Sequence, residues 1–168
     1  MTRQQPSGDT NMVLYAEDVE RMNRLLDEFL RLSAARLAFL VDRTGRVITR
    51  RGQDLRLDVE TLGALAAGTF AATREMARLA GEEQFSGMTH QGQRTHMHIA
   101  RVEDRTLFAV LFDEKTTLGM VKLYAGEAAR RLAAVFDEMR TRRTTPAEAL
   151  EAGFGQSAKS ALDQLLRD

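Results

Sequence analysis

The segment 58–81, DVETLGALAAGTFAATREMARLAG, constrains the fold most because it predicts one long helix with two unlike faces. Larger side chains recur along it at spacings of three and four, the period of a helical face buried against a core. The residues of this expected buried face are Leu62, Leu65, Ala66, Thr69, Ala72, Met76 and Leu79. The opposite face, here called the small-residue face, consists of Gly63, Ala64, Ala67, Gly68, Ala71 and Glu75.

The small-residue face has two interpretations. An exposed helical face ordinarily carries Lys, Glu, Gln and Arg, and glycine inside a helix costs about 1 kcal/mol relative to alanine. The glycines Gly63 and Gly68 therefore indicate that another backbone approaches closely. Either a partner protein packs on this face, or the helix is buried on both sides within its own fold.

The composition excludes several classes of function. The 168 residues carry 24 Lys and Arg against 24 Asp and Glu, a balance that does not favour a nucleic-acid partner. The absence of cysteine excludes disulfides, thiol catalysis and cysteine-based zinc sites. The N-terminus has no apolar core, and the longest apolar run, 37–41, is too short to span a bilayer. We therefore expect a soluble, cytoplasmic protein without membrane insertion.

Hydrophobic periodicity and turn residues predict eight elements joined by short connections. In chain order these are a helix at 13–35, strands at 36–41 and 46–50, a helix at 58–81, strands at 84–91, 94–102 and 105–112, and a helix at 117–140. Short connections make adjacent strands antiparallel. The sequence therefore predicts an α+β fold with a five-stranded antiparallel sheet, helices on both faces, and the very apolar strand 105–112 near the middle.

Both ends of the chain differ from this central part. Residues 1–11 are polar and are expected to be a disordered tail. The segment 141–156 combines a basic cluster, a proline and two glycines, which is typical of a flexible linker. Residues 157–168 then predict an amphipathic helix whose apolar side includes Leu162, Leu165 and Leu166. So short a helix needs a surface to lie on, either on its own domain or in a partner's groove.

Signals for catalysis are poor. The chain has neither a glycine-rich phosphate loop nor a Gly-x-Ser-x-Gly nucleophile turn. The three histidines cluster, and His96 and His98 share one face of a predicted strand. His90 or Glu82 would be the nearest third ligand, but two histidines on a solvent-facing or interface strand need no metal. We expect neither a metal nor a cofactor, and a pH-sensitive interface is the alternative use of the histidines.

Five stretches resemble the Roadblock/dynein light chain family, and within it the bacterial MglB-like gliding proteins. They are LAFLVDRTGRVI (37–48), LGALAAGTFAAT (62–73), MARLAGEEQF (76–85), HQG (90–92) and LFDEKTTLGMVKLY (111–124). The resemblance covers 13–139 and extends to the tail helix. It implies a Roadblock-type, profilin-like domain at 12–140 with the order α-β-β-α-β-β-β-α.

The resemblance also implies a function. MglB-like proteins are homodimers whose sheets join edge to edge and whose second helices form a layer that binds a small Ras-like GTPase of the MglA type. They accelerate GTP hydrolysis by repositioning the GTPase's own catalytic elements, so the chain is expected to be a regulator rather than an enzyme. The cellular role implied is polarity or motility, with a location at a cell pole. A Roadblock adaptor that does not stimulate hydrolysis and a small-molecule sensor are the alternatives.

The resemblance assigns site residues as follows. The GTPase-binding residues are Ala64, Gly68, Ala71, Ala72, Glu75 and Arg78. Glu75 departs from the family pattern, in which a smaller residue is expected. The dimer edge is expected at Phe85, Met88 and His90, and the tail helix is expected to contact the GTPase through Leu162, Leu165 and Leu166.

Overall fold

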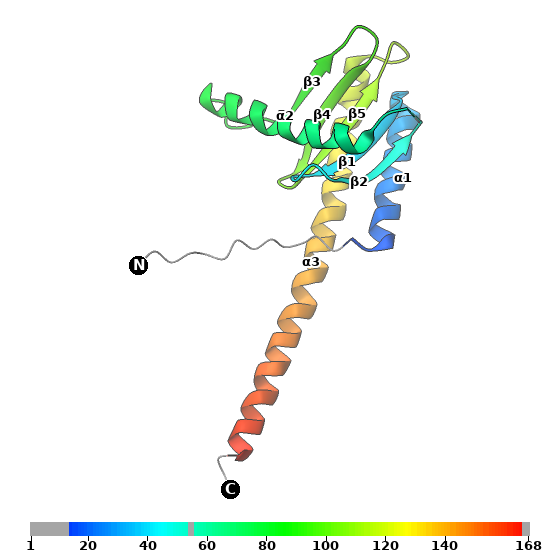
Figure 1. Cartoon of the computed structure of the whole chain (residues 1–168). Coiled ribbons are helices and arrows are strands. Elements are labelled where there is room, and N and C mark those ends of the chain that lie inside the picture. Colours follow the sequence, from blue (N-terminus) through cyan, green and yellow to red (C-terminus); the bar gives the residue numbers. More distant parts are fainter. Residues whose placement is uncertain (1–13, 54–55, 166–168) are drawn as a thin grey trace.

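The computed structural model describes residues 14–53 and 56–165, with side chains described as far as Arg142. Within these residues, five strands form one antiparallel sheet covered by three helices (Figure 1). The strands are β1 (Leu37–Asp42), β2 (Val47–Gly52), β3 (Gly87–Gln91), β4 (His96–Glu103) and β5 (Thr106–Phe112). The helices are α1 (Ala16–Ser33), α2 (Val59–Leu79) and α3 (Leu118–Leu165). The predicted order of elements is confirmed.

The strands lie in the order β2-β1-β5-β4-β3, and every neighbouring pair is antiparallel. The central strand β5 is buried along its whole length, as its apolar sequence predicts. It pairs with β1 across a long stretch of chain, with Phe39 opposite Ala109. This order leaves β2 and β3 as the two edges of the described sheet.

The sheet separates two apolar cores, because successive strand residues point to opposite faces. On one face, Ala38 and Leu40 of β1 pack beneath α1 and α3. On the other face, Phe39 and Val41 pack beneath α2. The prediction of helices on both faces is therefore confirmed, and α2 alone covers one side of the sheet.

Helix α1 buries Met22, Leu26 and Phe29 against the sheet, as its periodicity predicts. Leu32 follows Phe29 at a spacing of three, but 39% of Leu32 is exposed. In the last turn of α1, Ser33 is the buried residue, four positions after Phe29. The chain then leaves the helix at Ala34, whose φ of 56° is left-handed.

The structure differs from the expectation for the C-terminal region. Helix α3 runs without a break to Leu165, where the sequence analysis expected a linker at 141–156 and a separate helix at 157–168. Alanine, glutamate and leucine are frequent after residue 146 and favour a helix, whereas the prediction gave more weight to Pro146 and the glycines. Leu162 and Leu165 lie within α3, and Leu166 lies outside the described residues. None of the described helices has the length and apolar character needed to cross a membrane.

Candidate functional site

Helix α2 is fixed at its N-terminus by a side-chain cap. The backbone N–H of Thr61 donates to a carboxylate oxygen of Asp58 at 3.1 Å, and the Thr61 hydroxyl donates to the other at 2.6 Å. These hydrogen bonds hold the pKa of Asp58 below its ordinary value. The cap satisfies a donor that the first helical turn would otherwise leave open.

The turn between β1 and β2 sets how closely α2 approaches the sheet. Gly45 of this turn has a φ of +91°, and a Cβ there would lie 2.7 Å from the Cα of Ala64. On α2 itself, a Cβ at Gly63 would lie 3.0 Å from Cγ2 of Val47. The helix and the hairpin are therefore in near-backbone contact, which only small residues permit.

The rotation of α2 differs from the one that the sequence analysis expected. The buried residues are Val59, Gly63, Ala66, Ala67 and Phe70, so two members of the small-residue face point into the core. Conversely, Leu65, Met76 and Leu79, expected to be buried, are exposed. The predicted buried face was wrong because the close contact with the hairpin requires small residues on the inward side of α2. The sequence prediction did not use Phe70, although an aromatic side chain usually marks the inward face of a helix.

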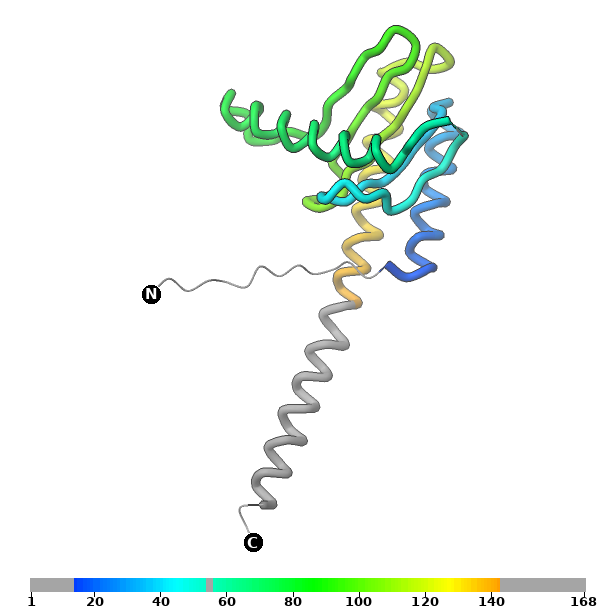
Figure 2. Tube along the Cα trace, in the orientation of Figure 1, coloured from blue at the N-terminus to red at the C-terminus, as the bar shows by residue number. Residues whose placement is uncertain are grey.

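The residues assigned to GTPase binding all lie on the outward side of α2. Ala64, Gly68, Ala71, Ala72, Glu75 and Arg78 are exposed. A Cβ at Gly68 would meet no atom within 4 Å, so no contact within the described residues requires glycine there. Figures 1 and 2 show the C-terminal part of α2 running past the sheet. The structure thus places these residues together on one surface, here called the α2 face.

Three large apolar residues that sequence reasoning assigned to the core join the α2 face. Leu65 is 63% exposed, Met76 62% and Leu79 74%. Side chains of this size on one helix are costly to leave in water, and clusters of them typically mark an interface. The α2 face therefore combines small residues with exposed apolar ones.

Glu75 and Arg78 form an ion pair on this face. Nη2 of Arg78 lies 2.5 Å from Oε1 of Glu75, and Nε of Arg78 also donates to both carboxylate oxygens. Arg78 holds the pKa of Glu75 below its ordinary value. Glu75, the residue that departs from the family pattern, is thus the ion-pair partner of Arg78.

The expected dimer edge coincides with a sheet edge only in part. Met88 and His90 lie on β3, an edge strand of the described sheet. Phe85 lies before the strand and packs against Phe70 of α2, with ring centroids 5.0 Å apart. Phe85 and Met88 are half-buried beside the core under α2, whereas His90 is exposed. Phe85 therefore supports α2 rather than extending the edge.

His98 of β4 is buried and not solvent-facing, which corrects the first expectation for it, and His96 is half-buried. His98 is 6% exposed on the α3 side of the sheet, and its Nδ1 lies 2.9 Å from the Thr89 hydroxyl. Burial and the nearby Lys122 lower the pKa of His98. His96 packs against the ring of Phe112, with centroids 5.1 Å apart.

The three histidines do not converge on one point. His90 pairs with Met97, so it lies on the sheet face opposite His98. Across the described part of the chain, no three His, Cys, Asp or Glu side chains are grouped so as to hold a metal ion. The arrangement therefore provides no basis for a metal centre in this region.

Comparisons with known proteins agree with this architecture. The family model of the Roadblock/LC7 domain matches residues 22–112. The gliding protein MglB of Thermus thermophilus is 36% identical with a TM-score of 0.72, covering 76% of this chain and 97% of that one. An MglB with a tetrameric arrangement is 36% identical with a TM-score of 0.73, covering 77% and 97%. MglB of Myxococcus xanthus is 32% identical with a TM-score of 0.70, covering 76% and 96%.

No curated protein sequence matches the chain. The family-model match runs from within α1 to the end of β5, so it includes the whole α2 face. The MglB structures extend the similarity beyond that segment, since they cover 76–77% of this chain. On this match, these relatives and the shared order of elements, the chain belongs to the Roadblock/LC7 family.

Proposed function

We propose that this chain is a homodimeric regulator that binds a small Ras-like GTPase of the MglA type and stimulates its hydrolysis of GTP. The observation that carries the proposal is the α2 face, an exposed surface of small and apolar residues on a chain 36% identical to MglB. The proposed setting is the cytoplasm of a bacterium, in cell polarity or motility, with a location at a cell pole.

The α2 face supports docking of a folded partner. Gly68, Ala71 and Ala72 have almost no side chain, so a partner backbone can come close without displacing anything. Ala64 lies one turn before Gly68, Glu75 lies one turn after Ala71, and Arg78 lies about one further turn along. We propose that the small residues form the centre of the GTPase contact and the ion pair its polar rim.

The exposed apolar residues support a dimer that shares this layer. Leu65, Met76 and Leu79 are each more than half exposed, and a second copy of α2 would cover them. The strand β3 offers an unpaired backbone edge within the described sheet, where the sheets of two copies could join. The tetrameric arrangement of one MglB relative is consistent with self-association of this kind of chain.

The proposed stimulation is indirect. Arg78 is bound at both Nε and Nη2 by Glu75, which suits a fixed rim contact better than an arginine inserted into another protein's active site. The regulator would then act by holding the GTPase's own catalytic elements in position. We further propose that Leu162, Leu165 and Leu166 contact the GTPase away from its nucleotide.

A hydrolysis assay tests the proposal. The purified chain is mixed in stoichiometric amounts with the Ras-like GTPase of the same organism, and phosphate release is followed in single-turnover conditions. We expect an increase of about tenfold or more in the rate, because correct positioning of existing groups lowers the barrier by at least about 1.4 kcal/mol. An unchanged rate with no binding overturns the proposal, whereas binding with an unchanged rate identifies an adaptor.

The dimer is tested separately by sedimentation velocity. Leu79→Glu should shift the chain toward monomer, because a charge replaces an apolar side chain that is 74% exposed in the single chain. Leu123→Glu is the matched control, since Leu123 is 65% exposed but lies on α3, across the sheet. Equal behaviour of the two variants would contradict a dimer built on the α2 face.

A further inference from the structure

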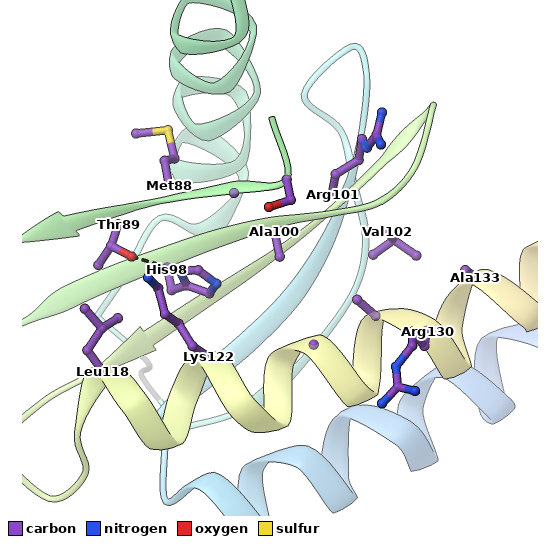
Figure 3. A pocket seen from close by; sticks show the side chains of 14 residues that line it. Met88, Thr89, His98, Ala100, Arg101, Val102, Leu118, Lys122, Arg130 and Ala133 are labelled. Carbon is purple, nitrogen blue, oxygen red and sulfur yellow. Dashed lines mark hydrogen bonds between the residues drawn. The ribbon is translucent and has the colours of Figure 1, made fainter. Parts of the chain in front are cut away.

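A groove of about 710 Å³ lies between α3 and the strands β3 and β4 (Figure 3). It is on the sheet face opposite α2, so it is separate from the proposed GTPase surface. Its α3 wall extends from Leu118 to Ala133, about 22 Å of helix. An extended peptide of about seven residues has the same length.

One part of the groove is apolar and shallow. Small side chains line it from both walls, with Ala100 and Val102 on β4 and Ala129 and Ala133 on α3. Gly126 of α3 also lines this part and contributes no side chain. A Cβ there would meet no atom within 4 Å, so the space beside it is empty. The described structure therefore leaves room for the apolar side chains of an occupant.

The other part of the groove is cationic. Figure 3 shows Lys122 extending from the first turns of α3 toward His98 and Thr89. Lys122 is exposed, and no carboxylate among the described side chains forms an ion pair with its Nζ. Burial and Lys122 itself both lower the pKa of His98, so the histidine stays neutral and the lysine supplies the charge.

The remaining charges of the groove have the same sign. Arg130 of α3 is the second cation of the lining and pairs with Glu127. Arg101 alternates with Ala100 and Val102 along β4, so its side chain points to the other face of the sheet, where it lies near Asp104 (Figure 3). The fourteen lining residues include no Asp or Glu. A groove of one sign attracts segments of the opposite sign.

We propose that this groove binds an acidic, partly apolar peptide segment of a partner protein. Apolar side chains of the segment would lie over Ala100, Val102 and Ala129, and a carboxylate would pair with Lys122. The groove follows α3 from Leu118 to Ala133, a length that suits an extended segment better than a compact metabolite. The groove lies on the other face of the sheet from the proposed GTPase surface, so a second protein would bind the regulator at the same time as the GTPase. The β3 wall of the groove adjoins the proposed dimer edge.

The test uses the full-length chain and a fluorescein-labelled peptide of about twelve residues that alternates glutamate and leucine. Fluorescence anisotropy should show saturable binding that weakens with added salt. Lys122→Glu should weaken it about tenfold or more, because the proposed ion pair becomes a repulsion. Gly126→Leu should weaken it about fivefold or more by filling the groove, without a folding cost, since leucine favours a helix more than glycine does.

Matched controls lie on the same part of the chain. Gly119→Leu makes the same change on α3 outside the groove lining, and Lys115→Glu makes the same charge reversal in the preceding loop. Both should keep the affinity within about twofold. Circular dichroism verifies the fold of each variant. Of the two test variants, Lys122→Glu changes the charge of the groove and Gly126→Leu changes its volume.

Three results would overturn the proposal. The first is affinity unchanged by both Lys122→Glu and Gly126→Leu. The second is a failure of specificity, which can show in either of two measurements. Equal binding of a peptide with lysine in place of glutamate would indicate nonspecific adhesion, and equally strong competition by polyphosphate would indicate a general polyanion surface. The third is a change in oligomeric state caused by Gly126→Leu, which would make a second copy of this chain the occupant.

Discussion

Arg142 of α3 donates a hydrogen bond through Nη2 to Oδ1 of Asp18 on α1, 124 residues earlier in the chain. Asp18 is 1% exposed, and its other carboxylate oxygen has no hydrogen-bond partner within the described residues. The guanidinium of Arg142 also lies 6.0 Å from the ring centroid of Tyr15. This contact joins the start of α1 to α3 at the point where α3 leaves the domain.

Removing the arginine should destabilise the domain. Arg142→Ala leaves the buried Asp18 carboxylate without its cation, and we expect the free energy of unfolding to fall by about 1–3 kcal/mol. Urea denaturation measures the change. Arg131→Ala is the matched control, because Arg131 joins the same two helices through Glu28 in an exposed pair at 2.8 Å. Its loss should cost less than about 1 kcal/mol, and a larger loss than for Arg142→Ala would contradict this account.

The two glycines of α2 should respond in opposite directions to alanine. Gly63→Ala places a methyl group 3.0 Å from Val47 and 3.3 Å from the Gly45 carbonyl, so we expect destabilisation of about 1–2 kcal/mol. Gly68→Ala meets nothing and should stabilise the chain by about 0.5–1 kcal/mol through helix propensity. Chemical denaturation of both variants under the same conditions measures the difference. Equal effects would mean that α2 is rotated differently from the structure described.

A bulky charge on the α2 face should block the GTPase. Ala71 is exposed, so Ala71→Arg should change the stability by less than about 0.5 kcal/mol while lowering GTPase affinity at least about tenfold. Isothermal titration calorimetry measures the affinity, and sedimentation measures the oligomeric state. Ala134→Arg, an exposed position on α3, is the control and should bind normally. If Ala71→Arg instead unfolds or becomes monomeric, the position lies inside the fold or the dimer.

The stability of the domain should depend on the protonation of His98. Its pKa is lowered from 6.5 by burial and then by Lys122, so the unfolded chain binds a proton more readily than the folded one. Stability should therefore be full above about pH 7 and fall as the pH drops below about 6.5, by at most about 1.4 kcal/mol per pH unit. His98→Gln should flatten this slope in denaturation curves between about pH 7 and 5. His90→Gln, at an exposed position, should leave the slope unchanged.

Much of the α2 face could be anticipated from the sequence, but its apolar part could not. Gly68, Ala71 and Glu75 were predicted to be available to a partner, and the structure leaves them exposed. Leu65 and Met76 were predicted to be buried, because a spacing of three and four gives the period of a helix without giving its rotation. Because alanine occurs on both faces and Glu75 is the one charged residue of the small-residue face, two rotations fit the pattern almost equally well.

The sequence by itself determined the order of the elements, the central position of β5 and the family, because these depend on local periodicity, turn residues and short motifs along the chain. The tertiary structure alone decided the rotation of α2, the inward direction of His98 and the path of α3 beyond residue 140. The physical reason is that burial is a property of two surfaces in contact. Gly63 is buried because the β1–β2 hairpin lies directly against it, and His98 because α3 crosses β4 there.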